Sequence, residues 1–276
     1  MTDRPAADPS AFAPKKSLGQ NFLRDPHLLE KIAELADIPA GGTVLEIGAG
    51  TGALTRALAA RAGRVLAVEV DERLIPGLQQ TFADQPHVEI IHGDILTLDL
   101  SERLRDTPYL IVANLPYYIT SAILRHIFEH LPRPQRVVVT VQREVAERLI
   151  AGPGDMSLLA VSVQFYGQPR LLLRLKPAAF WPPPEVESAV VRIDVYERPP
   201  VDVPDEGVFF RVVRAGFGQK RKQLRNALSA GLRLDKESTA ALLHQAGIDP
   251  QRRAETLSLD EWAALARVVA LYEGGA

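Results

Sequence analysis

The chain has 276 residues, of which 46% are hydrophobic and 24% charged, with a formal net charge of −2 and no cysteine. This composition predicts a globular protein with one large and one small domain, and it excludes a disulfide framework, thiolate chemistry and nucleic-acid binding through overall charge. There is no apolar run long enough to cross a bilayer, no secretory signal pattern and no metal-ligand spacing among the six histidines, so we expect a cytoplasmic protein that uses neither membrane nor metal.

The N-terminal region is predicted to contain a tail, a basic arm and a first helix. Residues 1–14 are rich in proline and alanine and are expected to be mobile. Lys15 and Lys16 precede a glycine and an apolar pair. This pattern is typical of a basic arm that folds back on the body and contacts RNA, although a solvated arm would have the same sequence. Asp25-Pro26 then supplies a helix cap and a proline for the first helical turn.

The next stretch predicts a buried strand, a glycine turn and a helix. The apolar run 44–47 is typical of a central parallel strand, and Gly48, Gly50 and Gly52 follow it directly. Glycine tolerates positive φ and has no side chain, so this turn lets a ligand touch the backbone at the start of a helix. A second strand at 64–70 places the acid Glu69 where the carboxyl end of a strand faces the ligand crevice.

Two ligand classes use this arrangement. Gly48-x-Gly50-x-x-Ala53 satisfies the fingerprint of nicotinamide and flavin dinucleotides, with Glu69 for the ribose. S-adenosylmethionine is the other class, because its methyltransferases have the same acid–hydrophobe–glycine turn and the same ribose-binding acid. The glycines alone do not decide between the two ligands, nor do they exclude a turn that binds nothing.

Strands and helices alternate further along the chain and predict an α/β fold. Besides 44–47 and 64–70, we expect strands at 88–92, 109–113, 136–141, 171–175 and 189–195. We expect helices at 121–130 and 144–150, and we favour a helix over a strand at 157–166. The alternation predicts a doubly wound, mostly parallel seven-stranded sheet whose last two strands form a closing pair.

Two motifs follow strand ends in this sheet. Asp94 comes after the third strand, where it could accept a hydrogen bond from an adenine amino group or only cap its turn. Asn114-Leu115-Pro116-Tyr117 follows the fourth strand. An adenine amino group is a poor nucleophile, so a site that methylates it needs acceptors for its two hydrogens. The Asn114 side-chain oxygen and the Leu115 carbonyl, held in place by Pro116, are candidates. Tyr117 offers a ring for base stacking, worth about 1–3 kcal/mol. A plain turn with a core tyrosine is the alternative.

Phe180 is a second aromatic candidate. It stands just before the run 182–184 of three prolines, which holds a loop rigid at low entropic cost. A rigid loop could present Phe180 so that an extruded base is sandwiched against Tyr117. A hydrophobic plug beneath the loop is the alternative, and Trp181 is an equal candidate for the packed residue.

The C-terminal part predicts a linker and a helical domain. Residues 198–207 are rich in proline and acid, and 208–276 carry helical patterns. Within them, the segment 211–225 has six cations, no acid and an apolar side, which favours an amphipathic helix with a basic face that binds the RNA backbone. A solvated basic face is the alternative. The cations are Arg211, Arg214, Lys220, Arg221, Lys222 and Arg225.

Taken together, these motifs resemble the ribosomal RNA adenine dimethyltransferase family. The resemblance runs in family order from Lys15 over nearly the whole chain. The matching segments are 19–23, 46–52, Glu69, 93–94, 114–117, 142–145, 180–190 and 221–228. Between Gly152 and the helix near residue 157 the chain is shorter than is usual in the family, so no contact is carried over to that loop.

The resemblance implies a class I methyltransferase domain, Rossmann-like, over residues 15–197, with S-adenosylmethionine as cofactor. A mobile tail at 1–14, a linker at 198–207 and an RNA-contacting helical domain at 208–276 complete the expected organisation. The implied cofactor contacts are Asn21 and Leu23 folded over the cofactor, the turn at Gly48 and Gly50, Glu69 at the ribose, Asp94 at the adenine, and Asn114 between cofactor and target.

The resemblance further implies dimethylation of two adjacent adenosines in the 3′-terminal hairpin loop of small-subunit (16S) rRNA within an assembling subunit. We expect a monomer. Close relatives methylate large-subunit rRNA, and a non-catalytic ribosome-assembly factor is a further alternative. A nicotinamide oxidoreductase would have no use for the motif at 114–117.

Overall fold

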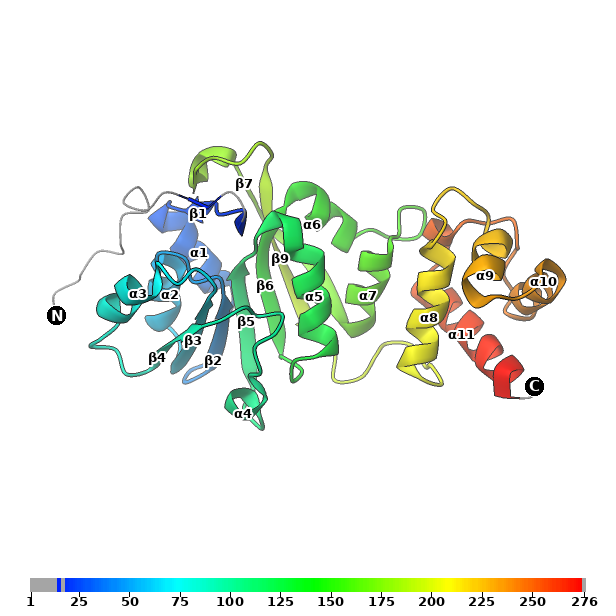
Figure 1. Cartoon of the computed structure of the whole chain (residues 1–276), viewed down its shortest axis with the longest axis horizontal. Coiled ribbons are helices and arrows are strands. Elements are labelled where there is room, and N and C mark those ends of the chain that lie inside the picture. The colour runs from blue at the N-terminus through cyan, green and yellow to red at the C-terminus, as the bar shows by residue number, and fades with distance from the viewer. Residues whose placement is uncertain (1–13, 16–17, 275–276) are drawn as a thin grey trace. The chain divides into compact units, whose positions relative to one another are not determined.

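The computed structural model describes residues 14–15 and 18–274, and its central feature within them is a seven-stranded sheet (Figure 1). The strand order is β4-β3-β2-β5-β6-β9-β7, with β2 to β6 paired in parallel and β9 antiparallel to β6. The predicted mostly parallel α/β sheet is therefore confirmed. Its strands are β2 (Thr43–Ile47), β3 (Arg64–Glu69), β4 (Val88–His92), β5 (Tyr109–Asn114), β6 (Arg136–Gln142), β7 (Gly167–Leu175) and β9 (Ser188–Val195).

The carboxyl ends of three neighbouring strands meet at one edge of this sheet. Ile47, the last residue of β2, pairs with Val68 of β3 and Ala113 of β5. The residues that follow therefore lie at the same edge, and the glycine turn after β2 stands between the ends of β3 and β5. This is the edge at which open parallel sheets bind ligands.

Helices flank the sheet and bury its faces. The cap predicted at Asp25 is confirmed, because its carboxylate accepts hydrogen bonds from the N–H groups of His27 and Leu28. One face of the sheet packs against α1 and α2. Val65 and Ala67, which point to the same face of β3, belong to one buried cluster with Ile32 of α1 and Leu58 of α2. The helices along this part of the chain are α1 (Pro26–Leu35), α2 (Ala53–Ala59), α3 (Ile75–Thr81), α4 (Ser101–Leu104), α5 (Thr120–Glu129) and α6 (Arg143–Leu149).

Two short strands join segments that are far apart in the sequence. β1 (Phe22–Leu23) pairs antiparallel with β8 (Phe180–Trp181), Phe22 opposite Trp181 and Leu23 opposite Phe180. The predicted extended loop before the triple proline thus includes a paired strand. The pairing fixes the end of the N-terminal arm against this loop.

The described chain forms two compact units. The first runs up to Ala146, resumes over Gln168–Val195 and contains the sheet, whereas the second comprises Glu147–Gly167 and the chain from Tyr196 onward. The predicted boundary at residue 197 stays a prediction, although the second unit takes in a segment well before it. The helices of the second unit are α7 (Leu158–Tyr166), α8 (Glu206–Phe217), α9 (Leu224–Leu232), α10 (Lys236–Gln245) and α11 (Leu259–Gly274).

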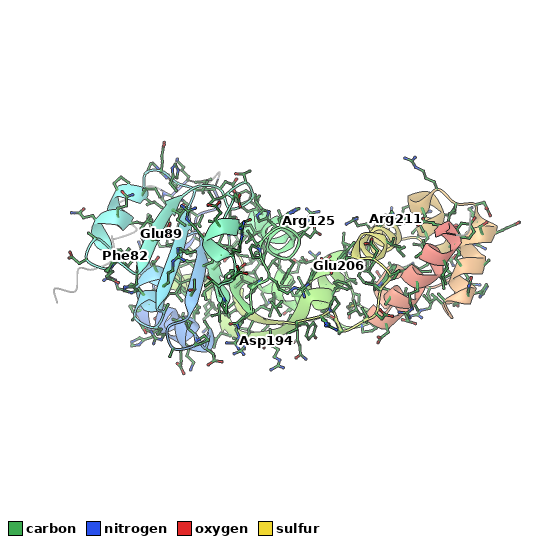
Figure 2. The ribbon with its side chains drawn as sticks, turned by 90° about the horizontal axis from the view of Figure 1, so that it is seen from below. Phe82, Glu89, Arg125, Asp194, Glu206 and Arg211 are labelled. Carbon is green, nitrogen blue, oxygen red and sulfur yellow. The ribbon has the colours of Figure 1, made fainter. Side chains whose placement is uncertain are left out.

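Aromatic packing and capping hold the second unit together. Phe165 of α7 stacks on Phe209 of α8 with ring centroids 4.6 Å apart. The hydroxyl of Tyr166 donates to Glu206 at the start of α8 over 3.1 Å, and Glu206 is seen on that helix in Figure 2. Before α11, Ser258 and Glu261 bond reciprocally and form a capping box.

The basic segment 211–225 does not lie on one amphipathic helix, so that prediction was wrong. α8 ends at Phe217 and α9 begins at Leu224. The chain turns between them, so that the apolar sides of α8 and α9 pack on each other. The two helices approach so closely that a Cβ added at Gly231 of α9 would lie 2.5 Å from the Cβ of Ala215 in α8. Within the described residues, no helix is long and apolar enough to cross a membrane.

Candidate active site

The glycine turn brings backbone atoms to the sheet edge. Gly48, Gly50 and Gly52 have φ of +79°, +59° and +82°, a region that favours glycine. The N–H groups of Gly48 and Ala49 both donate to the carbonyl of Val68, at 2.9 and 3.0 Å. The turn is thus held to the end of β3 while its remaining backbone faces the pocket.

Glu69 is the buried acid beside this turn. It is only 4% exposed, and its two carboxylate oxygens accept from the N–H of Gly50 at 2.7 Å and of Asp71 at 2.8 Å. Burial raises the pKa of Glu69, while these backbone hydrogen bonds act in the opposite direction. A carboxylate oxygen has more than one lone pair, so each oxygen can accept a further hydrogen bond from a ligand hydroxyl.

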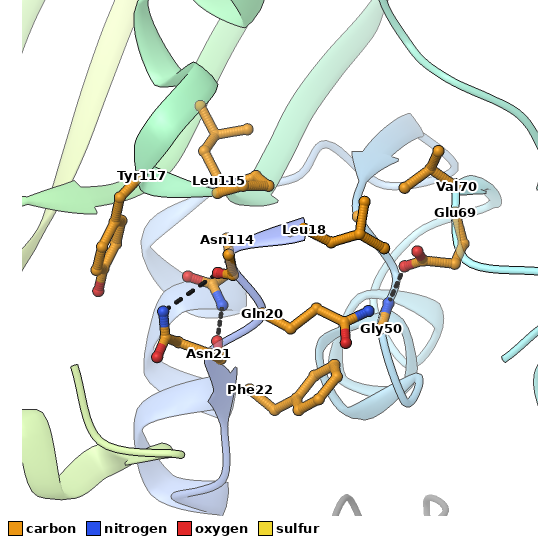
Figure 3. Close-up of a pocket in the computed structure, with 13 residues that line it drawn as sticks. Leu18, Gln20, Asn21, Phe22, Gly50, Glu69, Val70, Asn114, Leu115 and Tyr117 are labelled. Atoms are coloured by element: carbon orange, nitrogen blue, oxygen red, sulfur yellow. Dashed lines mark hydrogen bonds between the residues drawn. The ribbon is translucent and has the colours of Figure 1, made fainter. Parts of the chain in front are cut away.

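The motif at 114–117 forms the opposite wall of the pocket. The Nδ2 of Asn114 donates to the backbone carbonyl of Asn21 over 2.9 Å, so its Oδ1 is the atom left to accept from a ligand (Figure 3). The N–H of Leu115 donates to Thr140 O at 3.1 Å. The Tyr117 hydroxyl lies 2.6 Å from Ser188 Oγ, and burial raises the pKa of Tyr117. The wall is therefore held by the N-terminal arm and by strands β6 and β9.

One pocket brings most of the predicted site residues together (Figure 3). Its walls come from the N-terminal arm, the glycine turn, the end of β3 and the motif after β5. Eight predicted residues line it: Asn21, Gly48, Gly50, Glu69, Asn114, Leu115, Pro116 and Tyr117.

Three of the predicted catalytic and cofactor-binding residues lie outside this pocket. Leu23 is buried and lines a neighbouring cavity that shares Gly48 and Asn114 with the first. Phe180 is 3% exposed and belongs to the buried cluster beneath β1 and β8. Asp94 is exposed, and its Oδ1 accepts from the N–H of Leu96 at 3.0 Å, which is a turn-capping contact. The roles predicted for them stay predictions.

Glu46 is a residue whose importance the sequence reasoning did not single out. It lines the neighbouring cavity with Thr140, is 1% exposed, and neither carboxylate oxygen has a hydrogen-bond partner among the described residues. Burial raises its pKa to about 8. A buried carboxyl without a partner is costly, so a cationic or hydrogen-donating ligand group in this cavity would be favoured. An acid inside the apolar run 44–47 was the available signal.

The predicted RNA-binding cations differ in how they are held. Lys15 pairs with Asp71 at 3.3 Å, and Arg211 makes a bidentate pair with Glu273 at 2.7 and 2.5 Å. Lys16 lies outside the described residues. The other five are exposed, and no ion pair joins any of them within the described chain: Arg214, Lys220, Arg221, Lys222 and Arg225.

Comparisons with known proteins identify enzymes that methylate ribosomal RNA. Residues 11–271 match the family model described as ribosomal RNA adenine dimethylase. The chain is 48% identical over 255 residues to the ribosomal RNA small subunit methyltransferase A of Dehalococcoides mccartyi (strain ATCC BAA-2266 / KCTC 15142 / 195), covering 92% of this chain and 88% of that protein. It is 44% identical over 266 residues to the protein of the same name from Alkaliphilus metalliredigens (strain QYMF), covering 94% and 93%.

Solved structures are similar as well. The crystal structure of the 23S rRNA methyltransferase ErmE matches with a TM-score of 0.71 and 28% identity, over 91% of this chain and 100% of that one. A dimethyladenosine transferase from Plasmodium falciparum has the same fold, with a TM-score of 0.75 and 24% identity over 92% and 98% of the two chains.

Proposed function

The chain belongs to the ribosomal RNA adenine dimethylase family, and from this premise we propose that it dimethylates two adjacent adenosines in the 3′-terminal hairpin loop of small-subunit rRNA. It is an S-adenosylmethionine-dependent rRNA adenine dimethyltransferase. The small-subunit assignment is supported by relatives at 42–49% identity that carry this substrate in their names. We also propose that it works as a cytoplasmic monomer on an assembling subunit, where its rRNA substrate is found.

The described pocket fits S-adenosylmethionine, which when bound supplies a methyl group on a sulfonium cation. Glu69 would accept the ribose hydroxyls, because its oxygens lie in the pocket and keep free acceptor capacity. The positive-φ turn at Gly48 and Gly50 would let the cofactor approach the backbone. Glu46, buried without a partner, is suited to the cationic amine of the methionine end. Asn21 and Leu23 would cover the cofactor, and Asp94 would receive its adenine amine.

The observation that carries the proposal is the orientation of Asn114. Its amide nitrogen is engaged by the Asn21 carbonyl, so its oxygen is the pocket-facing acceptor. Together with the Leu115 carbonyl, it would accept the two hydrogens of a target adenine amine and aim the nitrogen lone pair. Pro116 fixes the turn that presents both acceptors. Positioning of this kind, rather than a strong base, is what attack on a sulfonium methyl requires.

Stacking would hold the target base. Tyr117 lines the pocket, and its ring is fixed by the hydrogen bond to Ser188. We propose that the base stacks on Tyr117 and that Phe180 contributes the second aromatic face. Because Phe180 is buried, that contact requires β8 to shift when RNA binds. Trp181 is engaged differently, since the Arg24 guanidinium lies 4.6 Å from its ring centroid.

We propose that the RNA backbone is bound by the basic segment of the second unit. Five of its cations are exposed, and no ion pair joins any of them within the described chain, namely Arg214, Lys220, Arg221, Lys222 and Arg225. Arg211 of this segment and Lys15 of the N-terminal arm are also predicted to bind RNA, but each already pairs with a carboxylate. Exposed cations that release counterions on binding supply most of the non-specific affinity for RNA.

The decisive experiment is methyl transfer from labelled S-adenosylmethionine, offered in parallel to unmethylated small subunits, naked small-subunit rRNA and large-subunit rRNA. The products are separated as nucleosides. We expect dimethyladenosine in the small subunit. Label in large-subunit rRNA would move the protein to the second candidate function, which its similarity to a 23S rRNA methyltransferase favours. Bound cofactor without transfer to any RNA would identify a non-catalytic assembly factor.

A further inference from the structure

Asp71 is a buried carboxylate that none of the proposed catalytic steps uses. It lies two residues beyond Glu69, after the end of β3, and its side chain has an exposed fraction of 0%. Its oxygens accept from Lys15 Nζ at 3.3 Å, from Gln20 Nε2 at 2.9 Å and from Arg73 at 2.6–3.3 Å. A buried charge of this kind is stable only when its partners remain in place.

Two of these partners belong to the N-terminal arm, here Lys15 and residues 18–23. The backbone N–H of Lys15 also donates to Gln20 Oε1 at 2.8 Å, so the two partners are tied to each other. The arm forms one whole wall of the proposed cofactor pocket, which is lined by every residue from Leu18 to Phe22. Whatever fixes the arm therefore fixes that wall.

The arm also contacts the remaining walls. A Cβ added at Gly19 would lie 2.9 Å from the ring of Tyr118, and the ring of Phe22 approaches an added Cβ at Gly50 to 3.1 Å. The carbonyl of Asn21 accepts from Asn114. At its far end the arm is held by the β1–β8 pairing. Asp71 thus anchors the part of the arm before β1, and it lies two residues from Glu69, the proposed ribose-binding acid.

Asp71 contacts that acid as well. Its backbone N–H donates to Glu69 Oε1 at 2.8 Å, while its side chain holds the arm. We propose that Asp71 is a positioning residue. Its side chain holds the N-terminal arm closed over the pocket, while its backbone N–H holds the Glu69 carboxylate in the position that binds the cofactor. Cofactor entry and product release then take place through opening of the Asp71–Gln20–Lys15 latch. This inference rests on the proposed cofactor pocket.

Substituting the side chain separates the two contacts, because Asp71→Ala keeps the N–H that serves Glu69 and removes the carboxylate that serves the arm. We expect binding of S-adenosylhomocysteine, measured by calorimetry, to weaken about 10- to 100-fold. Hydrogen exchange of the amides at 18–23 in the cofactor-free protein should accelerate about tenfold or more. The KM for S-adenosylmethionine should rise, whereas kcat at saturating cofactor should change much less.

A matched control variant and a double-mutant cycle test whether the latch acts through the contact between Asp71 and the arm. Glu72→Ala removes the neighbouring exposed carboxylate, which contacts no residue of the arm within the described chain, so arm exchange should stay within about twofold of wild type. Gln20→Ala removes the hydrogen bond from Gln20 Nε2 to Asp71, and this test does not depend on Asp71→Ala folding well. In a double-mutant cycle, Gln20→Ala should add little to Asp71→Ala, because the Gln20–Asp71 hydrogen bond is already absent from the Asp71→Ala variant.

The outcomes distinguish this inference from the proposed function. Wild-type protein that fails to bind S-adenosylhomocysteine would overturn the cofactor pocket itself. Normal wild-type binding, with unchanged arm exchange and affinity in Asp71→Ala and Gln20→Ala, would overturn the latch and leave the enzyme assignment standing. A loss of melting temperature alone, with no change in exchange at 18–23, would make Asp71 a turn-stabilising residue and would also overturn it.

Discussion

Glu46 shows how a single buried carboxyl links the proposed cofactor site to the stability of the fold. Its pKa rises from 4.5 to about 8 through burial. Between those values the folded protein holds a proton that the unfolded chain has released. The free energy of unfolding contributed by this residue therefore falls as pH rises from about 4.5 to about 8, and it is constant above that range.

We predict that Glu46→Gln removes this pH dependence. Relative to wild type, the variant should gain stability progressively between pH 5 and pH 8, by a few kcal/mol at most, at about 1.4 kcal/mol for each unit of pKa difference. Urea unfolding of both proteins at pH 5, 6.5 and 8 measures the difference. Glu129→Gln, on the exposed end of α5, controls for loss of one charge. A constant offset between Glu46→Gln and wild type at all three pH values would contradict the prediction.

Asn114 is the residue on which the proposed chemistry depends most. We predict that Asn114→Ala lowers kcat by on the order of 100-fold or more, the usual effect of removing one preorganised hydrogen-bonding group from a reacting centre. The fold should survive, since the loss of one hydrogen bond to Asn21 costs about 1 kcal/mol. Single-turnover methylation and thermal unfolding measure the two quantities, with calorimetry to correct for weaker cofactor binding. Turnover at the wild-type rate would refute the acceptor role.

At the scale of elements, α8 is constrained by how closely its neighbours approach. A Cβ placed on Gly216 would lie 2.3 Å from Cη2 of Trp262, whose side chain is fully buried in α11. The α8–α11 contact therefore depends on the absence of a side chain at this position.

We predict that Gly216→Ala destabilises the protein by about 1–3 kcal/mol through overpacking, even though alanine is the better helix former. Thermal or urea unfolding measures the change. Gly77→Ala is the matched control, because it lies in a helix with nothing within 4 Å of the added Cβ. That variant should be neutral or stabilised by up to about 1 kcal/mol. Equal effects at both positions would show that the α8–α11 contact adapts.

The connection between α8 and α9 carries the prediction for RNA. Replacing Lys220, Arg221 and Lys222 by alanine should weaken RNA binding and lower the salt slope of log K by about 2–3, since each lost phosphate contact contributes about 0.7–0.9. Filter binding across a salt series measures the slope. Arg211→Ala should have a smaller effect, because that guanidinium is already paired with Glu273. An unchanged slope in the triple variant would place the RNA surface elsewhere.

Local patterns in the sequence predicted the sheet and the helix cap at Asp25, because apolar runs, glycines and Asp-Pro signals act over a few residues. The turn at Gly48 and the acid at Glu69 could be located in the same way. The latch between Gln20 and Asp71 could not, since it joins residues 51 positions apart whose side chains give no periodic signal. The turn between α8 and α9 was missed because basic residues mark an exposed surface, whether it is helix or loop.

At the scale of the whole molecule, the chain passes between the two compact units more than once. It leaves the first unit after Ala146, returns at Gln168 and leaves again after Val195. α7 consequently packs on helices that follow it by some forty residues: Phe165 is fully buried and stacks on Phe209.

We predict that a chain truncated after residue 197 is destabilised, although it retains the entire sheet. It would expose Phe165 and Tyr166, whose ring partners lie on α8. The measurements are binding of a hydrophobic dye and the unfolding temperature, both compared with the full chain. Each exposed aromatic side chain forfeits about 1.5–3 kcal/mol of burial. A truncated protein with the same unfolding temperature and no dye binding would show that α7 is stable alone.

Because the chain passes between the two units more than once, the second unit cannot be exchanged as one continuous segment. A recombination event at a single point can transfer α8 to α11 from a relative, but it leaves behind the α7 segment against which those helices pack. Exchanging the second unit between members of this family therefore requires two segments, Glu147–Gly167 and the C-terminal part, to be moved together. Chimeras joined only near residue 197 should have a poorly matched contact between α7 and α8 and a lowered unfolding temperature. Their stability should recover when α7 is taken from the same donor as α8.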